Sequence, residues 1–138
     1  MVSHSRPLAV EQSFEVKTYD VDFVNIVHNM VYIRWLEDLR LQLLTAHYPL
    51  EAVLAAGQSP ILIRTEIDYR YPVRFGDRVM GHMWLSDLSR VRWTVSAEIF
   101  AGDKLAASSV QQGYFADRET LRPIRIPQAL QQKWLADR

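Results

Sequence analysis

The chain has no cysteine, few glycines and prolines, and no excess of charge of either sign. Without cysteine it cannot form a disulfide, a thiolate zinc site or a cysteine nucleophile. Its 16 basic residues are matched by 16 acidic ones, which gives no reason to expect nucleic acid or a membrane surface as partner. No stretch approaches the roughly 18 apolar residues of a membrane helix, and the first dozen residues lack a signal-peptide run. We therefore expect a cytoplasmic protein with one domain over residues 1–138 and no membrane insertion.

Hydrophobic periodicity predicts one strand, a helical region and then four more strands. Strands are expected at residues 13–18, 61–71, 78–85, 90–100 and 105–116. A short helix at 50–56 should end at Gly57, and Pro127 should open a short C-terminal helix. Residues 101–104 are typical of a hairpin turn. Because the later connections are short, the later strands should be antiparallel.

Residues 29–47 follow a helical period and are apolar on two sides. One stripe consists of Met30, Ile33, Leu41 and Leu44, and the other of Tyr32, Trp35, Leu36, Leu39 and Leu43. The remaining polar strip is Arg34, Asp38, Gln42 and Thr45. A helix apolar over most of its circumference should be buried, which predicts an α+β domain with an antiparallel sheet wrapped around a long central helix. The uncovered edge strand and sheet face favour a homodimer or homotetramer.

Three segments carry a resemblance to a known family. They are YDVDFVNIVHN and YIRWLE within residues 19–37, RTEIDY and PVRFGD within 64–77, and DRET and RPIRIP within 117–127. Together they resemble the 4-hydroxybenzoyl-CoA thioesterase family of hotdog-fold proteins, over about residues 12 to 130. The resemblance implies the hotdog fold and hydrolysis of an acyl-CoA or acyl-carrier-protein thioester without a cofactor. It also implies that Asp22 is the catalytic carboxylate.

Thioester hydrolysis needs a group that polarises the carbonyl and either a nucleophile or a base that activates water. The N-terminus of the helix at residue 29 can supply the first, because its unpaired N–H groups lie at the positive end of the helix dipole. The amides of Asn29 and Met30 are the candidates. Asp22 lies seven residues before Asn29, in the loop that leads to the same helix end. The sequence leaves nucleophile and general base open for Asp22.

Other residues near this loop have two readings each. His28 either orients the substrate or acts as an acid, or it packs at the helix start. The side chain of Asn29 either binds the thioester or caps the helix. Asn25 is a substrate-binding candidate at a position where the family usually has glycine, and asparagine tolerates the positive φ such a turn needs. Asp20 is interpreted as a turn residue, because its spacing does not fit the family pattern.

Coenzyme A carries phosphates, so a basic patch is expected despite the zero net charge. Arg90 and Arg92 are predicted to project from one strand face and to bind phosphates. Arg70 and Arg74 form a second basic pair, and for either pair a solvated strand face is the alternative. The acyl pocket is expected between subunits, lined by residues such as Tyr32, Trp35 and Thr65, although such aromatics also serve as plain core.

Two further functions compete with the thioesterase hypothesis. Asn25, Asn29 and Val31 depart from the family pattern, which is also compatible with a non-catalytic acyl-CoA binding or sensing module. A hotdog hydratase is a weaker alternative, because His28 lies on the wrong side of the loop. No histidine pair has helical metal-ligand spacing, so no metal site is expected. The acyl group, coenzyme A versus carrier protein, and dimer versus tetramer stay open.

Overall fold

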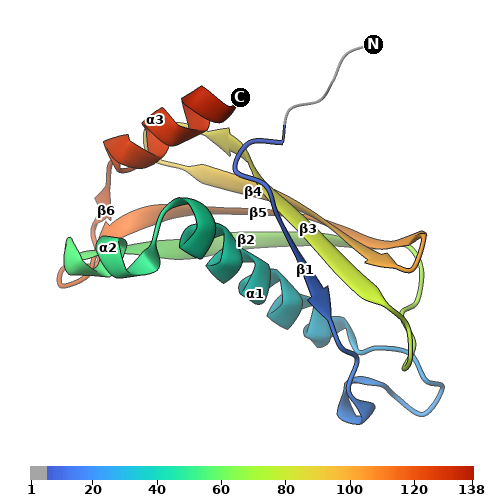
Figure 1. The fold of residues 1–138 in the computed structure, drawn as a ribbon. Helices are drawn as coiled ribbons and strands as arrows, with labels where there is room; N and C mark the ends of the chain where they lie inside the picture. Colours follow the sequence, from blue (N-terminus) through green and yellow to red (C-terminus); the bar gives the residue numbers. More distant parts are fainter. Residues whose placement is uncertain (1–5) are drawn as a thin grey trace.

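The computed structural model describes residues 6–138, so residues 1–5 of the predicted domain lie outside the described part. Its strands form one antiparallel sheet in the order β1-β3-β4-β5-β2, with β6 paired to β5 (Figure 1). The strands are β1 Val10–Phe14, β2 Gln58–Tyr69, β3 Val79–Leu88, β4 Trp93–Ala101, β5 Lys104–Asp117 and β6 Pro123–Ile124. The helices are α1 Asn29–His47, α2 Leu50–Ala55 and α3 Gln128–Asp137, with the 3-10 turn η1 at Thr18–Asp20. The predicted α+β hotdog fold is confirmed.

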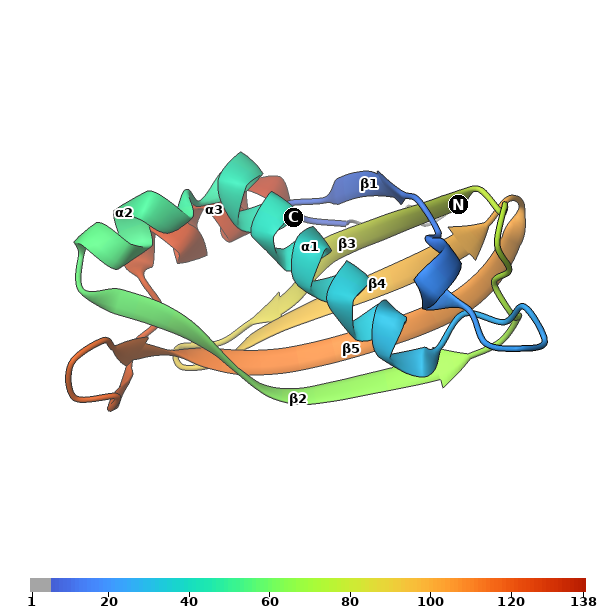
Figure 2. The same cartoon turned by 90° about the horizontal axis from the view of Figure 1, so that it is seen from below.

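The long helix α1 has the predicted bounds and lies along one face of the sheet, packed against β1 and β3 (Figure 2). The stripe that contains Trp35, Leu36 and Leu39 is buried, each of these residues being no more than 1% exposed. Trp35 stacks on Phe14 of β1, with ring centroids 5.5 Å apart. This stripe attaches the helix to the sheet.

The other apolar stripe of α1 is not covered by residues 6–138, which corrects the prediction that the sheet of the same chain buries the helix on both sides. Met30 is 75% exposed, Ile33 43% and Leu41 45%, and Leu44 is half-buried. The sheet curves past one side of the helix only, so burial of the second stripe needs something other than residues 6–138. Sequence periodicity reports that a face is apolar, but not whether the same chain covers it.

The first strand begins and ends earlier than the predicted segment 13–18. Its residues pair with β3 in the register Val10↔Met83 to Phe14↔Val79. After Phe14 the chain turns, because the Lys17 N–H donates to Asp20 Oδ2 at 2.9 Å and the Asp20 N–H donates to the carbonyl of Lys17. The polar turn therefore ends the strand inside the alternating pattern, although Val16 is still buried.

The strand β2 contains a β-bulge between Leu62 and Arg64, which the predicted alternation did not include. Ile61 pairs with Tyr114 on the outer face, whereas Ile67 pairs with the buried Ser109 on the face toward α1. The extra residue of a bulge reverses which side chains face the core. Ile61 and Ile67, predicted to share a face, thus lie on opposite ones.

Both shorter helices lie at one end of the sheet (Figure 1). The helix α2 is followed by Gly57 at φ 75°, the left-handed conformation expected there. The helix α3 follows Pro127 and is attached to β3 by a hydrogen bond of 2.8 Å from Trp134 Nε1 to the carbonyl of Leu85. Within residues 6–138, no helix combines the length and apolar character needed to span a membrane.

Candidate functional site

The loop before α1 folds back on itself and holds Asp22 in a defined orientation. Val21 and Val27 form an antiparallel bridge, and the Asp22 N–H donates to the carbonyl of Ile26 at 3.0 Å. One carboxylate oxygen of Asp22, Oδ1, accepts the N–H groups of Val24 and Ile26, each at 3.0 Å. The other oxygen, Oδ2, has no partner among residues 6–138, and the side chain is exposed. Asp22 is therefore a fixed carboxylate with one oxygen open.

Asn25 shapes and anchors this loop. Its φ is 60°, so the loop keeps the left-handed turn for which asparagine is suited. Its side-chain oxygen Oδ1 accepts the N–H of Phe75 at 3.0 Å, and Arg74 donates to the carbonyl of Val24 at 3.3 Å. The Val27 N–H adds a bond to the carbonyl of Val73. The turn after β2 thus holds the Asp22 loop in place, and Asn25 already uses its side-chain oxygen for this.

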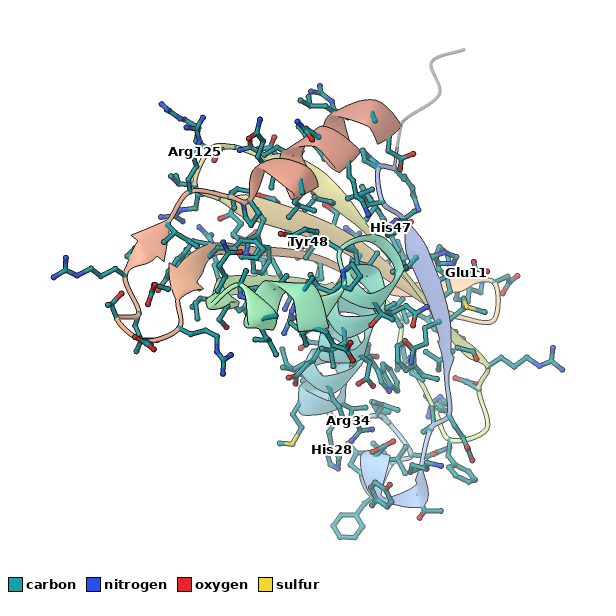
Figure 3. The ribbon with its side chains drawn as sticks, turned by 60° about the vertical axis from the view of Figure 1, so that its left-hand side comes forward. Glu11, His28, Arg34, His47, Tyr48 and Arg125 are labelled. Carbon is teal, nitrogen blue, oxygen red and sulfur yellow. The ribbon has the colours of Figure 1, made fainter. Side chains whose placement is uncertain are left out.

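The helix α1 begins with open N–H groups. His28 is its N-cap, without a side-chain capping bond, so Asn29 is the first helical residue and not the cap. The N–H groups of Asn29 and Met30 have no partner within residues 6–138, whereas the Val31 N–H donates to the carbonyl of His28. Figure 3 places the exposed His28 at this end, opposite the end that carries His47. The chain thus brings Asp22 and an open helix N-terminus to the same end of the molecule.

Asp20 plays a different part from Asp22. It is 1% exposed, and both of its oxygens lie 3.1 Å from Nη2 of Arg34. Its carbonyl also accepts the N–H of His28 at 2.9 Å. Asp20 therefore ties the turn η1 to α1, in agreement with its interpretation as a structural turn residue.

Two further predicted binding residues, Tyr32 and Thr65, make contacts within the fold itself. Tyr32 is 3% exposed and packs edge-on against Trp35 and Tyr69, at centroid distances of 5.3 and 5.1 Å. Burial raises the pKa of the Tyr32 hydroxyl, while an interaction with the backbone of Val73 partly opposes this. Thr65 on β2 accepts a hydrogen bond of 3.0 Å from Gln111. Their roles in substrate binding stay predictions.

Arg90 and Arg92 do not lie on a strand face, which corrects the prediction for this pair. They belong to the turn between β3 and β4, where the hydroxyl of Ser89 accepts the N–H groups of Val91 and Arg92. These bonds prevent the strand from starting at residue 90. The turn lies at the far end of β3, about 30 Å from the end of the sheet that carries Asp22, given 10 residues in the strand.

An apolar cavity of about 330 Å³ lies between the C-terminal half of α1, α2 and the sheet. Its apolar lining includes Leu41, Leu44, Leu54, Leu62, Trp93 and Phe115. The polar residues that line it are Glu37, Arg40 and Ser59. Arg40 donates to the buried Gln111 at 2.7 Å. No local sequence pattern indicates that Arg40 and Gln111 belong to this cavity wall, because only the pairing of distant elements brings them together.

Within one chain, this cavity is remote from Asp22. Arg40 lies 11 residues after Asn29, which is about 16 Å along the helix axis. No group of three or more His, Asp or Glu residues within 6–138 is arranged to hold a metal ion. The described part of the chain thus presents a carboxylate and helix N-terminus at one end of α1 and an apolar cavity toward the other.

Comparison with known proteins finds a matching family and two similar proteins. Residues 16–134 match the family described as the thioesterase-like superfamily. A provisionally named esterase of Aquifex aeolicus is 28% identical over 95 residues, which is 68% of this chain and 74% of that protein. A provisionally named acyl-CoA thioesterase of Bacillus subtilis, YneP, is 22% identical over 122 residues, covering 86% of this chain and 88% of that protein.

Solved structures share the fold at low sequence identity. The 1,4-dihydroxy-2-naphthoyl-CoA thioesterase Slr0204 of Synechocystis has a TM-score of 0.80 at 18% identity, covering 92% of this chain and 96% of that one. A thioesterase of Thermus thermophilus, solved with coenzyme A and Zn, has a TM-score of 0.80 at 22% identity, with 91% of each chain covered. The family match spans most of the chain, and the chain therefore belongs to the thioesterase-like superfamily of hotdog proteins.

Proposed function

We propose that this protein hydrolyses acyl-CoA thioesters with Asp22 as its catalytic carboxylate. The observation that carries the proposal is the pairing of a fixed carboxylate, open at Oδ2, with the unpartnered N–H groups of Asn29 and Met30. The family supports thioester chemistry in general. The two N–H groups form an oxyanion site for the thioester oxygen, because they lie at the positive end of a 19-residue helix.

The reaction needs no group beyond these and water. Asp22 Oδ2 takes a proton from water while the hydroxide oxygen bonds to the thioester carbon. The negative charge moves to the carbonyl oxygen, where the Asn29 and Met30 amides stabilise it. Collapse of this intermediate breaks the carbon–sulfur bond, and the departing thiolate receives the proton from Asp22. Direct attack of Oδ2 on the carbon, through a mixed anhydride that water then hydrolyses, gives the same products.

A second copy of the chain completes this site in our proposal. The stripe of Met30, Ile33, Leu41 and Leu44, with Glu37 at its centre, is a mostly apolar and largely exposed helix face of a kind that usually becomes buried in an interface. The strand β2 is also an edge of the sheet, open to pair with a second β2. Two helices packed antiparallel about a two-fold axis bring the N-terminus of one to the C-terminal half of the other. Asp22 of one protomer then meets the cavity of its partner.

The same symmetry supports coenzyme A as the carrier of the acyl group. The turn with Arg90 and Arg92 lies at the end of the sheet away from Asp22 within one chain. An antiparallel dimer moves this turn toward the Asp22 loop of the partner, where guanidinium groups are placed to bind phosphates. Arg74 adds a positive charge beside the Asp22 loop, since it bonds the carbonyl of Val24. Arg90 and Arg92 thus keep their proposed role despite their changed setting.

The test is thiol release from aliphatic and aromatic acyl-CoA thioesters, with the wild type and Asp22→Asn side by side. An asparagine at 22 still accepts the N–H groups of Val24 and Ile26 through its oxygen, so the loop should keep its shape. We expect turnover to fall about a hundredfold or more. Asp103→Asn, an exposed residue of the β4–β5 turn, serves as the matched control and should retain activity.

Full activity of Asp22→Asn would refute the catalytic assignment. Tight binding of acyl-CoA without turnover by the wild type would instead favour the acyl-CoA binding module. The structure weakens one motive for that alternative, because Asn25 preserves the left-handed turn.

A further inference from the structure

Arg40 is a charged group in the lining of a mostly apolar cavity, which it shares with Glu37 and Ser59. It extends from α1 into the cavity lined by Leu41, Leu44 and the strand residues Val95 and Phe115. Apolar walls suit a hydrocarbon chain, and a volume of about 330 Å³ is at the lower end of ordinary ligand pockets. A guanidinium in such a place needs an explanation, because burying a charge costs free energy unless an opposite charge or hydrogen bonds compensate.

A relay of two hydrogen bonds, centred on the buried Gln111, holds this guanidinium in place. Arg40 Nη1 donates to Gln111 Oε1 at 2.7 Å, and Gln111 Nε2 donates to Thr65 Oγ1 at 3.0 Å. Gln111 is 1% exposed, and its amide orientation is set because only the oxygen accepts from a guanidinium. The relay joins α1, β5 and β2. These two hydrogen bonds therefore fix the position of the Arg40 side chain.

The relay leaves most of the guanidinium without a partner. Gln111 takes one N–H of the five, and within residues 6–138 no carboxylate lies at ion-pair distance from Arg40. Desolvation lowers the pKa of Arg40, with the nearby charge of Glu37 acting in the opposite direction. An arginine stays charged in proteins. Glu37 lines the same cavity, but its carboxylate makes no ion pair with Arg40, so the remaining N–H donors of this half-buried cation have no anionic partner within residues 6–138.

We propose that this anion is the terminal carboxylate of the substrate, so that the protein acts on acyl-CoA thioesters whose acyl chain ends in a carboxylate. The apolar walls contact the methylene chain, and Arg40 binds the carboxylate by charge-assisted hydrogen bonds. The proposal rests on the proposed function, since the thioester end must reach Asp22 of a second copy. The cavity borders the exposed stripe at Glu37 and Leu41, where that copy would pack.

A competing partner for Arg40 is Glu37 of the second copy. Glu37 lies midway between Met30 and Leu44, so a two-fold axis through the stripe would bring two Glu37 residues together. Arg40 would then neutralise them within the interface. The two readings differ in what they predict for substrates: an interface ion pair gives no preference for a carboxylate at the end of the acyl chain.

The experiment compares kcat/KM for matched thioesters with the wild type, Arg40→Met and Arg40→Lys. The pairs are hexanoyl-CoA with adipoyl-CoA, octanoyl-CoA with suberoyl-CoA, and decanoyl-CoA with sebacoyl-CoA. We expect the wild type to favour the carboxylate member of at least one pair. Arg40→Met should lower that preference about ten- to a hundredfold, the scale of a hydrogen-bonded charge. Arg40→Lys keeps the charge and should retain part of the preference.

Binding separates this proposal from the catalytic one. Calorimetric titration of the Asp22→Asn protein with suberoyl-CoA and octanoyl-CoA measures the same preference without turnover. A preference that disappears in Asp22→Asn/Arg40→Met supports the carboxylate site even if hydrolysis is never seen. Equal binding of both thioesters by Asp22→Asn overturns the proposal. If Arg40→Met also weakens the dimer in sedimentation, Arg40 is an interface ion pair.

Discussion

The backbone N–H of Phe75 donates to the side-chain oxygen of Asn25 across 50 residues of chain, at 3.0 Å. This bond links the loop that carries Asp22 to the turn that follows β2. Asn25 has a φ of 60°, so one residue provides both the left-handed turn and the long-range anchor. A glycine, which is usual at this position in the family that the sequence resembles, could provide only the first. The exposed Asp22 loop therefore depends on a side chain for its position.

Substitutions of Asn25 should separate these two contributions. Asn25→Gly keeps the positive φ but removes the bond to Phe75, and we expect a loss of about 1 kcal/mol in the free energy of unfolding. Asn25→Ala also forces a side chain into the left-handed region, so its loss should be about 1 kcal/mol larger. Urea denaturation of the two variants measures the difference. Equal stability of both variants would show that the turn geometry contributes little.

Gly113 should tolerate no larger residue. It lies on β5 opposite Leu62 and Trp93, and a Cβ at this position would overlap the carbonyl oxygen of Ile61 and the ring of Trp93. The backbone oxygen cannot move without breaking the β2–β5 ladder. We expect Gly113→Ala to destabilise the protein by about 3 kcal/mol or to prevent folding, as other overpacked core changes do. Gly102→Ala, where nothing lies within 4 Å, is a control for loss of a glycine, although its φ of 60° adds local strain.

Short-range sequence patterns predicted the features that depend on neighbouring residues. The bounds of α1 followed from its period, and the hairpin at Gly102 from its turn residues, because both depend on neighbours in sequence. The loop placement of Asp22 before an open helix N-terminus was accessible for the same reason. The bulge between Leu62 and Arg64 was not, since an extra residue in a strand shows only when its partner is known. The Arg40–Gln111 bond joins residues 71 positions apart, and no spacing rule indicates such a contact.

The exposure of Asp22 leads to a prediction about its chemical role. Because Oδ2 is open to solvent and Oδ1 is held by two N–H groups, we expect Asp22 to activate water and not to attack the thioester itself. A single turnover in water labelled with heavy oxygen tests the anhydride route in which water attacks the Asp22 carboxyl carbon. Water activation places the label in the released acid and leaves the protein unlabelled. Mass spectrometry that finds label in the peptide containing Asp22 would demonstrate the anhydride route instead.

The buried hydroxyl of Tyr32 makes stability depend on alkaline pH. Burial raises its folded-state pKa above the ordinary value of about 10, as it also does for Tyr48 and Tyr69. Above pH of about 10 the unfolded chain releases this proton while the folded chain retains it, so the unfolded state gains stability as pH rises. The stability that the protonated Tyr32 hydroxyl contributes is fully present below pH of about 10 and is lost as the pH rises through the folded-state pKa. Tyr32→Phe cannot ionise at this position, so its unfolding free energy should fall less steeply above pH of about 10 than that of the wild type. Urea denaturation across this range measures both slopes, with Tyr19→Phe, an exposed tyrosine, as the matched control. Parallel slopes for Tyr32→Phe and the wild type would show that the hydroxyl ionises as readily in the folded protein as in the unfolded chain.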